Sequence, residues 1–245
     1  MLFLASVIIS HRHQFIFLKT IKTAGTSVEL FLRQFCGPDD VVTPVVPEDE
    51  GLAIEMGVGG PRNYTRLKKP RECGPSDLRR AIRKRAWPHV EVYSQHQRAS
   101  EIRTLVGDEV WNGYQRITIV RDPWEQFVSR FFWVTRPENR RSETIEEYLD
   151  QLMRKPANWN WAIYSIDDEI AATQILRYET LEGDLRELCE SLGLNPRLDL
   201  PRAKANVRPS SARPGQVLTQ SQIDRIAIVA RREIEEFGYS APLPG

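Results

Sequence analysis

The chain has 245 residues, of which 41% are hydrophobic and 27% are charged, and its formal net charge is +1. These are ordinary values for a globular protein, and a charge so near zero gives no overall attraction for nucleic acid or for an anionic membrane. Three widely spaced cysteines without a CxxC pair argue against a disulfide framework and against a zinc site, so we expect one soluble, cytoplasmic domain over residues 1–245.

The predicted elements begin with an apolar run at residues 1–9, which is too short for a membrane helix and is predicted to be a strand or an extension. Residues 14–18 predict a second strand. A loop rich in lysine, threonine and glycine follows, and apolar residues then recur at helical spacing over 27–35. Prolines and glycines interrupt the pattern over 37–88, so this interval is predicted to be a loop-rich insertion.

Beyond the insertion, strands alternate with helices. The strands are predicted at 90–93, 117–120 and 173–178, and the helices at 99–110, 123–134, 144–153, 181–192 and 219–237. Pro123 suits the first turn of a helix, and Gly193 suits the end of one. This alternation predicts a three-layer α/β fold in which helices flank a mostly parallel sheet.

Ligands of an open parallel sheet bind beyond the carboxyl ends of the strands, so the residues at those ends are the candidates for function. The loop after residues 14–18 combines Lys22 and Gly25 with hydroxyl residues and leads into a helix, a combination that suits an anion. The later predicted strands lead to His96, to Arg121 and to Glu179. Together these residues predict a site for an anionic ligand with an acid–base step.

Each of these features also has an ordinary structural explanation. A lysine and several hydroxyls before a helix are common at a capped helix start, an Arg-Asp-Pro sequence commonly forms a salt-bridged turn, and a single histidine is more often structural than catalytic. Only their combination favours a site. His11 and His13 have the spacing of a metal pair on a strand, but no carboxylate or cysteine completes a ligand set, so no metal is expected.

Two motifs carry a resemblance to a known family. The KTAGTS sequence at 22–27 resembles the 5′-phosphosulfate-binding loop of sulfotransferases that use 3′-phosphoadenosine 5′-phosphosulfate (PAPS). The segment at 117–131, with Arg121 and Ser129 eight residues apart, is similar to the 3′-phosphate-binding element of that family. The LRYE sequence at 176–179 and the FGY sequence at 237–239 are similar to further parts of the fold. The nearest subgroup in this resemblance is the glycan 2-O and 6-O enzymes with their bacterial counterparts.

The resemblance implies a role for each residue of the motifs. It implies a P-loop-like strand, loop and helix in which Lys22 stabilises charge on the leaving phosphate. The rest of the loop would hold the phosphosulfate, and its residues are Thr23, Ala24, Gly25, Thr26 and Ser27. Arg121 and Ser129 would hold the 3′-phosphate. One departure is Ile21, where relatives often have a proline; it loosens the restraint on the loop but removes no functional group.

His96 is the expected general base, because an imidazole with a pKa of about 6.5 suits proton transfer at neutral pH. His89 is the rival, but it precedes the predicted 90–93 strand and so would lie toward the other end of the sheet. Glu179 is the next candidate by its position at a strand end. The acceptor of the sulfonate is a hydroxyl or an amine of an unidentified glycan or small metabolite.

A basic stretch at 62–85 is either a solvated surface or a rim that attracts an anionic acceptor. A nucleotide kinase lacks support because no GxxxxGK[ST] sequence is present. A nucleic-acid-binding module built on the basic stretch is disfavoured by the near-neutral charge, and a PAPS-binding relative without activity is disfavoured by the presence of Lys22 and His96.

Overall fold

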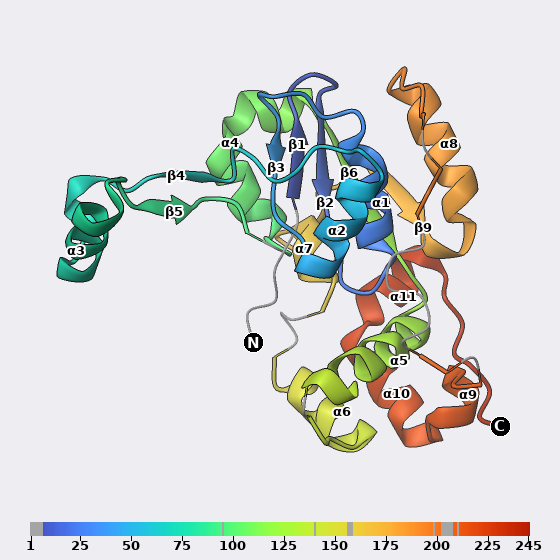
Figure 1. The fold of residues 1–245 in the computed structure, drawn as a ribbon. Helices are drawn as coiled ribbons and strands as arrows, with labels where there is room; N and C mark the ends of the chain where they lie inside the picture. The colour runs from blue at the N-terminus through green and yellow to red at the C-terminus, as the bar shows by residue number, and fades with distance from the viewer. Residues whose placement is uncertain are drawn as a thin grey trace.

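The computed structural model describes residues 7–94, 96–139, 141–155, 159–197, 199–201, 208–209 and 211–245. Its centre is a sheet with the strand order β3-β1-β2-β6-β9 (Figure 1). The strand bounds are Val7–Ser10 for β1, Phe15–Leu18 for β2, Val41–Val42 for β3, Gln115–Val120 for β6 and Gln174–Arg177 for β9. β2, β6 and β9 run parallel, while β1 is antiparallel to both β2 and β3. All these strands except β1 therefore point the same way, and the predicted mostly parallel sheet is confirmed.

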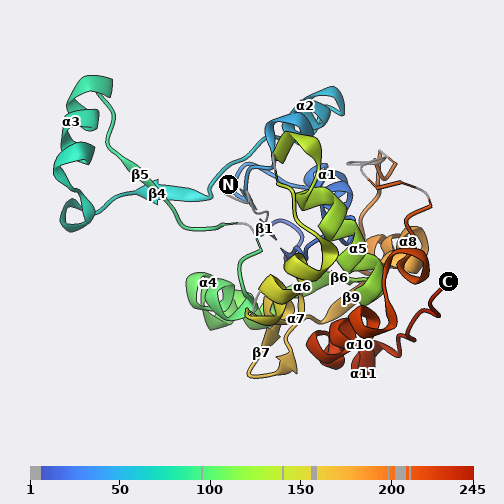
Figure 2. The ribbon, with the colours of Figure 1, turned by 90° about the horizontal axis from the view of Figure 1, so that it is seen from below.

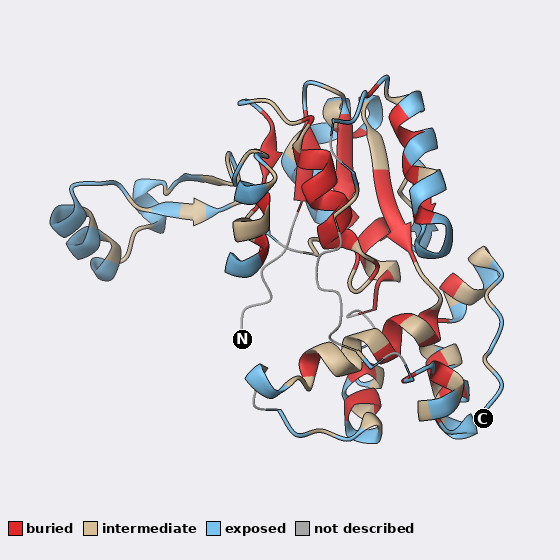
Figure 3. Ribbon diagram, turned by 45° about the vertical axis from the view of Figure 1, so that its right-hand side comes forward, coloured by how far each residue is buried: buried red, intermediate tan, exposed pale blue. Residues whose placement is uncertain are grey.

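Helices cover both faces of this sheet because the central strands are apolar on both sides. Phe15 and Phe17 of β2 pack with α1 (Gly25–Arg33) and α8 (Leu181–Ser191) on one face. Ile16 and Leu18 pack with α4 (Ala99–Gly113) and α7 (Trp161–Tyr164) on the other. Successive residues of a strand point to opposite faces, so this alternation produces three layers with a buried centre (Figure 3).

A group of helices lies beyond the carboxyl ends of β2 and β6 (Figure 1). Its core includes Trp124 and Phe127 of α5 (Pro123–Val134), Leu149 of α6 (Ile145–Met153) and Ile226 of α10 (Gln220–Val229). The short helix α9 (Pro214–Val217) precedes α10 in the sequence, and the helix α11 (Arg231–Phe237) follows it. The single helix predicted over 219–237 is wrong, because the backbone at Ala230 (φ −98°, ψ 15°) leaves the helical range and separates α10 from α11.

The predicted strand at 90–93 does not belong to the central sheet. The expectation that this strand ends beside the other strands of the sheet is therefore wrong. β5 (His89–Glu91) pairs instead with β4 (Thr65–Leu67), and this antiparallel hairpin projects from the body of the molecule (Figures 1 and 2). A central strand needs apolar residues on both faces, whereas both neighbours of Val90 in β5 are polar and exposed.

The interval 37–88 also contains helices that its prolines and glycines did not predict. These are α2 (Pro47–Glu55), α3 (Pro75–Lys84) and the 3₁₀ turn η1 (Pro70–Glu72). Each begins with a proline, which is favourable at the first position of a helix although it disrupts the interior.

The remaining elements are short. They are the hairpin of β7 (Ser165–Ile166) with β8 (Glu169–Ile170) and the 3₁₀ turns η2 (Pro137–Asn139) and η4 (Tyr178–Thr180). Among the helices of the described residues, none combines the length and the apolar character needed to cross a membrane.

Candidate functional site

The loop between β2 and α1 is held tightly against the neighbouring strand β6. Thr20 Oγ1 donates a hydrogen bond to the Ile119 carbonyl at 2.5 Å and lies 2.7 Å from Thr23 Oγ1. A Cβ atom on Gly25 would lie 2.7 Å from Lys19 Cγ, so the loop packs too closely there for any larger residue. The conformation of the loop is therefore fixed by backbone and side-chain contacts.

The same loop is shaped to receive an anion. Lys22 and Ala24 have positive φ angles of 61° and 63°, and such left-handed residues turn successive backbone amides toward one side. Ala24 is also the N-cap of α1, and an alanine side chain offers no oxygen to accept from the first amides of the helix. Those amides and the positive end of the helix dipole therefore suit a phosphate or sulfate group.

Two buried amide side chains clamp the peptide of Ile21, the residue before Lys22. Asn160 Oδ1 accepts from the Ile21 amide at 2.8 Å, and Asn160 Nδ2 donates to the Ile21 carbonyl at 3.0 Å. Gln126 Nε2 donates to the same carbonyl at 2.9 Å. The clamp restrains the backbone at the position where similar loops often have a proline.

The two lysines of the loop have different surroundings. Lys19 is buried and forms an ion pair with Glu29 of α1 at 2.8 Å. Lys22 Nζ lies 4.4 Å from the ring centroid of Trp133 on α5, a distance at which a cation and an aromatic ring attract. The ion pair gives Lys19 a structural role, whereas the side chain of Lys22 extends from the loop toward Trp133 of α5.

Arg121, the first residue after β6, links the two predicted motifs. Its Nη1 donates to the Lys22 carbonyl at 3.0 Å, and its guanidinium carbon lies 3.9 Å from the Tyr178 ring centroid. Its Nε is buried and has no hydrogen-bond partner among the described residues. Burial lowers the pKa of Arg121, so a nearby anion would compensate for the lost hydration of this cation.

Glu125 connects Arg121 with a second arginine that the sequence motifs did not identify. Arg121 Nη2 lies 3.3 Å from Glu125 Oε2, and Arg208 Nη1 donates to the same oxygen at 2.6 Å. Burial would raise the pKa of Glu125, but Arg208 and Arg121 together hold it below its ordinary value. Ser129 lies one helical turn after Glu125, on the same side of α5.

His96 lies at the loop, although the predicted strand that was expected to place it there is part of the hairpin. His96 Nδ1 is 2.9 Å from the Lys19 carbonyl oxygen. A carbonyl only accepts hydrogen bonds, so Nδ1 carries the proton and Nε2 is the basic nitrogen of the neutral ring. The residue has a positive φ of 48°, a conformation that is uncommon outside glycine.

The rival bases are placed differently. His89 is exposed on β5 of the projecting hairpin. Glu179 is exposed in η4, where its Oε1 accepts from the Asp122 amide at 2.8 Å and so supports the turn after β6.

The sequence reasoning missed Asn160, Gln126 and Arg208. Gln126 had a detectable signal, because it is a polar residue among the apolar residues of the predicted 123–134 helix and a buried amide needs partners. Asn160 and Arg208 had none, since each reaches the site from a distant part of the chain. His11 Nδ1 lies 2.9 Å from the Tyr114 hydroxyl, and the described part of the chain holds no group of three or more potential metal ligands.

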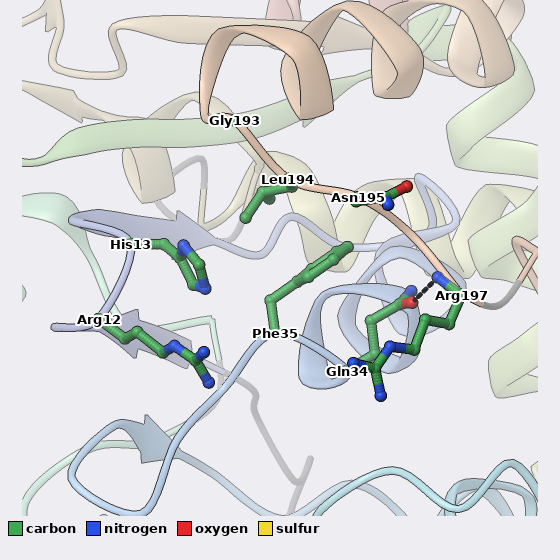
Figure 4. A pocket seen from close by; sticks show the side chains of 8 residues that line it. All are labelled: Arg12, His13, Gln34, Phe35, Gly193, Leu194, Asn195 and Arg197. Atoms are coloured by element: carbon green, nitrogen blue, oxygen red, sulfur yellow. Dashed lines mark hydrogen bonds between the residues drawn. The ribbon is translucent and has the colours of Figure 1, made fainter.

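One pocket lies away from this loop, between the turn that precedes β2 and the carboxyl-terminal ends of α1 and α8 (Figure 4). Its lining includes His13, Phe35 and Leu194. Because β2 begins at this end and the candidate loop follows its other end, the pocket and the loop belong to opposite ends of the sheet.

The structure combines an α/β sheet with a strand, loop and helix that suit an anion, adjacent arginines and an imidazole held against the loop, an arrangement that suits transfer of an anionic group. The model of the Sulfotransferase family matches residues 5–240. The chain therefore belongs to the sulfotransferase family, whose activity is sulfonyl transfer. No curated protein and no solved structure matches it.

Proposed function

We propose that the protein is a sulfotransferase that uses PAPS as its sulfonate donor and acts on a hydroxyl or an amine. The observation that carries the proposal is the contact between the two motifs, in which Arg121 donates to the carbonyl of Lys22. This contact brings a buried cation, whose Nε has no hydrogen-bond partner in the described part of the chain, next to a loop that suits a second anionic group. Two adjacent anion sites fit a donor with phosphate groups at both the 3′ and the 5′ positions.

The loop from Thr23 to Ser27 would hold the 5′-phosphosulfate through its amides and hydroxyls. Arg121 and Ser129 would hold the 3′-phosphate, and Arg208 would add a second cation to that subsite. Glu125 orients both arginines through the ion pairs described above. PAPS, when bound, supplies an activated sulfonate group, and transfer of that group leaves 3′,5′-diphosphoadenosine.

His96 Nε2 would accept the proton of the attacking acceptor as the new bond between the acceptor and sulfur forms. The bond from sulfur to the phosphate oxygen breaks in the same displacement, and Lys22 would stabilise the negative charge that develops on this oxygen. A positioned base typically contributes a factor of about 10²–10⁴ to the rate. A donor aimed at developing charge contributes about 10²–10³.

The acceptor subsite lies next to His96, and the base of the projecting hairpin leads to it. The amides of Val92 and Tyr93 donate to the Tyr64 carbonyl, so residues 92–93 connect the hairpin to the His96 region. A glycan or a small metabolite remains the proposed acceptor class, and the basic charge of the hairpin favours anionic examples.

Incubation of the purified protein with sulfur-labelled PAPS and a panel of hydroxyl and amine acceptors tests the proposal. We expect labelled product and 3′,5′-diphosphoadenosine to form in equal amounts without added magnesium.

Lys22→Ala should lower kcat by about 10²–10³ while product binding changes little, because the charge that Lys22 meets grows during bond cleavage. A Lys22→Ala defect restricted to the KM for PAPS would make Lys22 a binding residue only.

A further inference from the structure

The projecting hairpin, here called the arm (residues 65–91), extends away from the rest of the molecule, which is here called the body (Figures 1 and 2). β4 and β5 pair with each other, and α3 sits at the far end (Figures 1 and 2). None of the residues of α3 is buried. A helix usually buries its apolar face against the rest of the protein. The exposed apolar face of α3 therefore indicates a surface that another molecule covers.

Contacts within the arm hold α3 in place. Lys68 pairs with Asp77 near the start of α3 at 2.8 Å, and Trp87 Nε1 donates to the Lys68 carbonyl at 2.7 Å. Arg66 pairs with Glu72 at 2.7 Å. The arm therefore presents α3 in a defined orientation before any partner binds, which reduces the entropy lost on association.

The two sides of α3 differ in chemistry. Leu78 and Ile82, one turn apart, are 46% and 81% exposed and form an apolar stripe with Ala81. Four basic side chains lie on the other sides of the helix, namely Arg79, Arg80, Arg83 and Lys84. A purely anionic ligand would neutralise the basic side but would leave the apolar stripe in water.

The charge of the chain is divided unequally between the arm and the rest. The arm carries nine lysines and arginines against three carboxylates, a net charge of +6, so the remaining residues carry −5 of the overall +1. On the body, α2 has no lysine or arginine and exposes Glu48 and Glu55, whereas its Asp49 is buried and its Glu50 pairs with Arg33; Ile54 of the same helix is 78% exposed. This helix therefore offers an exposed apolar residue together with two exposed carboxylates, the complement of α3.

We propose that α3 of one copy of this chain packs on α2 of a second copy. Leu78 and Ile82 would cover Ile54, while Arg79 and Arg83 would meet the exposed Glu48 and Glu55. In a closed pair each copy supplies one arm and one α2, so the contact occurs twice, as the symmetry of most homodimers requires. A lipid surface would satisfy α3 but would leave the matching surface of α2 without a role.

The molar mass of the full chain, measured by light scattering and by sedimentation at rising concentration and at low and high salt, tests this proposal. We expect a dimer that weakens at high salt, because exposed charge pairs are screened. Ile82→Asp should give a folded monomer, since Ile82 is 81% exposed and contacts little within its own chain. Ile228→Asp is the matched control, because Ile228 is 67% exposed on α10 and should leave the dimer intact.

Charge reversal on both helices separates a direct contact from a general effect. Arg79→Glu with Arg83→Glu should weaken dimerisation by roughly 10–100-fold, because the new carboxylates would face Glu48 and Glu55, and like charges repel. Adding Glu48→Lys and Glu55→Lys to the same chain should restore most of the lost affinity. A wild-type monomer at all concentrations, a dimer that survives every one of these changes, or a monomer that binds phosphatidylserine vesicles through α3 would each overturn the proposal.

Discussion

At the scale of single residues, the hydrogen bond from His96 to the Lys19 carbonyl decides which ring nitrogen is basic. The bond fixes Nδ1 as the donor, so Nε2 remains to take a proton from an acceptor. His89 provides an internal comparison, since it is a histidine on the exposed arm, away from the loop.

Replacement of His96 by alanine is therefore expected to lower kcat by about 10²–10⁴, the usual contribution of a general base. Binding of 3′,5′-diphosphoadenosine should be retained within a few-fold, because the hydrogen bond of His96 is to Lys19, which lies outside the residues proposed to hold the phosphates. Steady-state kinetics and calorimetry on His96→Ala, with His89→Ala as the control, measure both quantities. Near-normal turnover in His96→Ala, or an equal loss in His89→Ala, would show that the base lies elsewhere.

At the scale of elements, the loop between β2 and α1 is positioned by Asn160, which lies 139 residues after Ile21 in the sequence. Asn160, immediately before α7, holds both polar groups of the Ile21 peptide, and Gln126 of α5 holds the carbonyl as well. The orientation of Lys22 therefore depends on how α5 and α7 pack at the carboxyl end of the sheet.

Asn160→Ala should weaken binding of 3′,5′-diphosphoadenosine and lower the unfolding free energy by about 1–3 kcal/mol, because the half-buried Ile21 amide loses its partner while the Ile21 carbonyl keeps Gln126. Asn63→Ala is a suitable control. Asn63 Nδ2 also donates two hydrogen bonds to the backbone, at Pro38 and Asp40, but near the base of the arm. Calorimetric binding that falls equally in the two variants would indicate a general loss of stability and not a role for Asn160 in the loop.

The accuracy of the sequence-based prediction also varied by element. Pro123 and the apolar spacing after it predicted α5 with both of its ends, because the proline and the helical period are local signals. The run at 90–93 was placed in the wrong sheet, since three or four residues with one strong apolar position do not specify a partner strand. Lys22 and Arg121 were predicted from motifs, and His96 was predicted from the end of a strand that in fact belongs to the hairpin. Asn160 and Arg208 depend on long-range packing that local patterns do not encode.

At the scale of the whole molecule, a buried carboxylate joins the last helix to α7. Glu233 of α11 is fully buried and accepts hydrogen bonds from Trp159 Nε1 and from the Tyr164 hydroxyl. Burial raises the pKa of Glu233 to about 7, from an ordinary value of 4.5, although both hydrogen bonds oppose this shift. The residue therefore binds a proton more tightly in the folded protein than in the unfolded chain.

This difference in proton binding predicts the direction of a pH effect on stability. The contribution of Glu233 is complete below about pH 4.5 and is lost as the pH rises through about 7. Glu233→Gln mimics the protonated side chain, because the Tyr164 hydroxyl can turn to accept a hydrogen bond. Denaturant unfolding should show the wild type losing up to about 3 kcal/mol more than Glu233→Gln between pH 5 and pH 8. Parallel curves for the two proteins would rule out this linkage.

The proposed donor site is distinguished from an ordinary nucleotide site by the subsite for a 3′-phosphate that we propose at Arg121. Titration calorimetry of 3′,5′-diphosphoadenosine and of AMP compares two nucleotides that differ only in that phosphate. We expect the diphosphate to bind roughly 100-fold more tightly, since each hydrogen bond to a charged group contributes about 1.5–3 kcal/mol, and we expect Arg121→Ala to remove most of the difference. Equal Kd values for the two nucleotides, or a preference that is unchanged in Arg121→Ala, would contradict the proposed donor site.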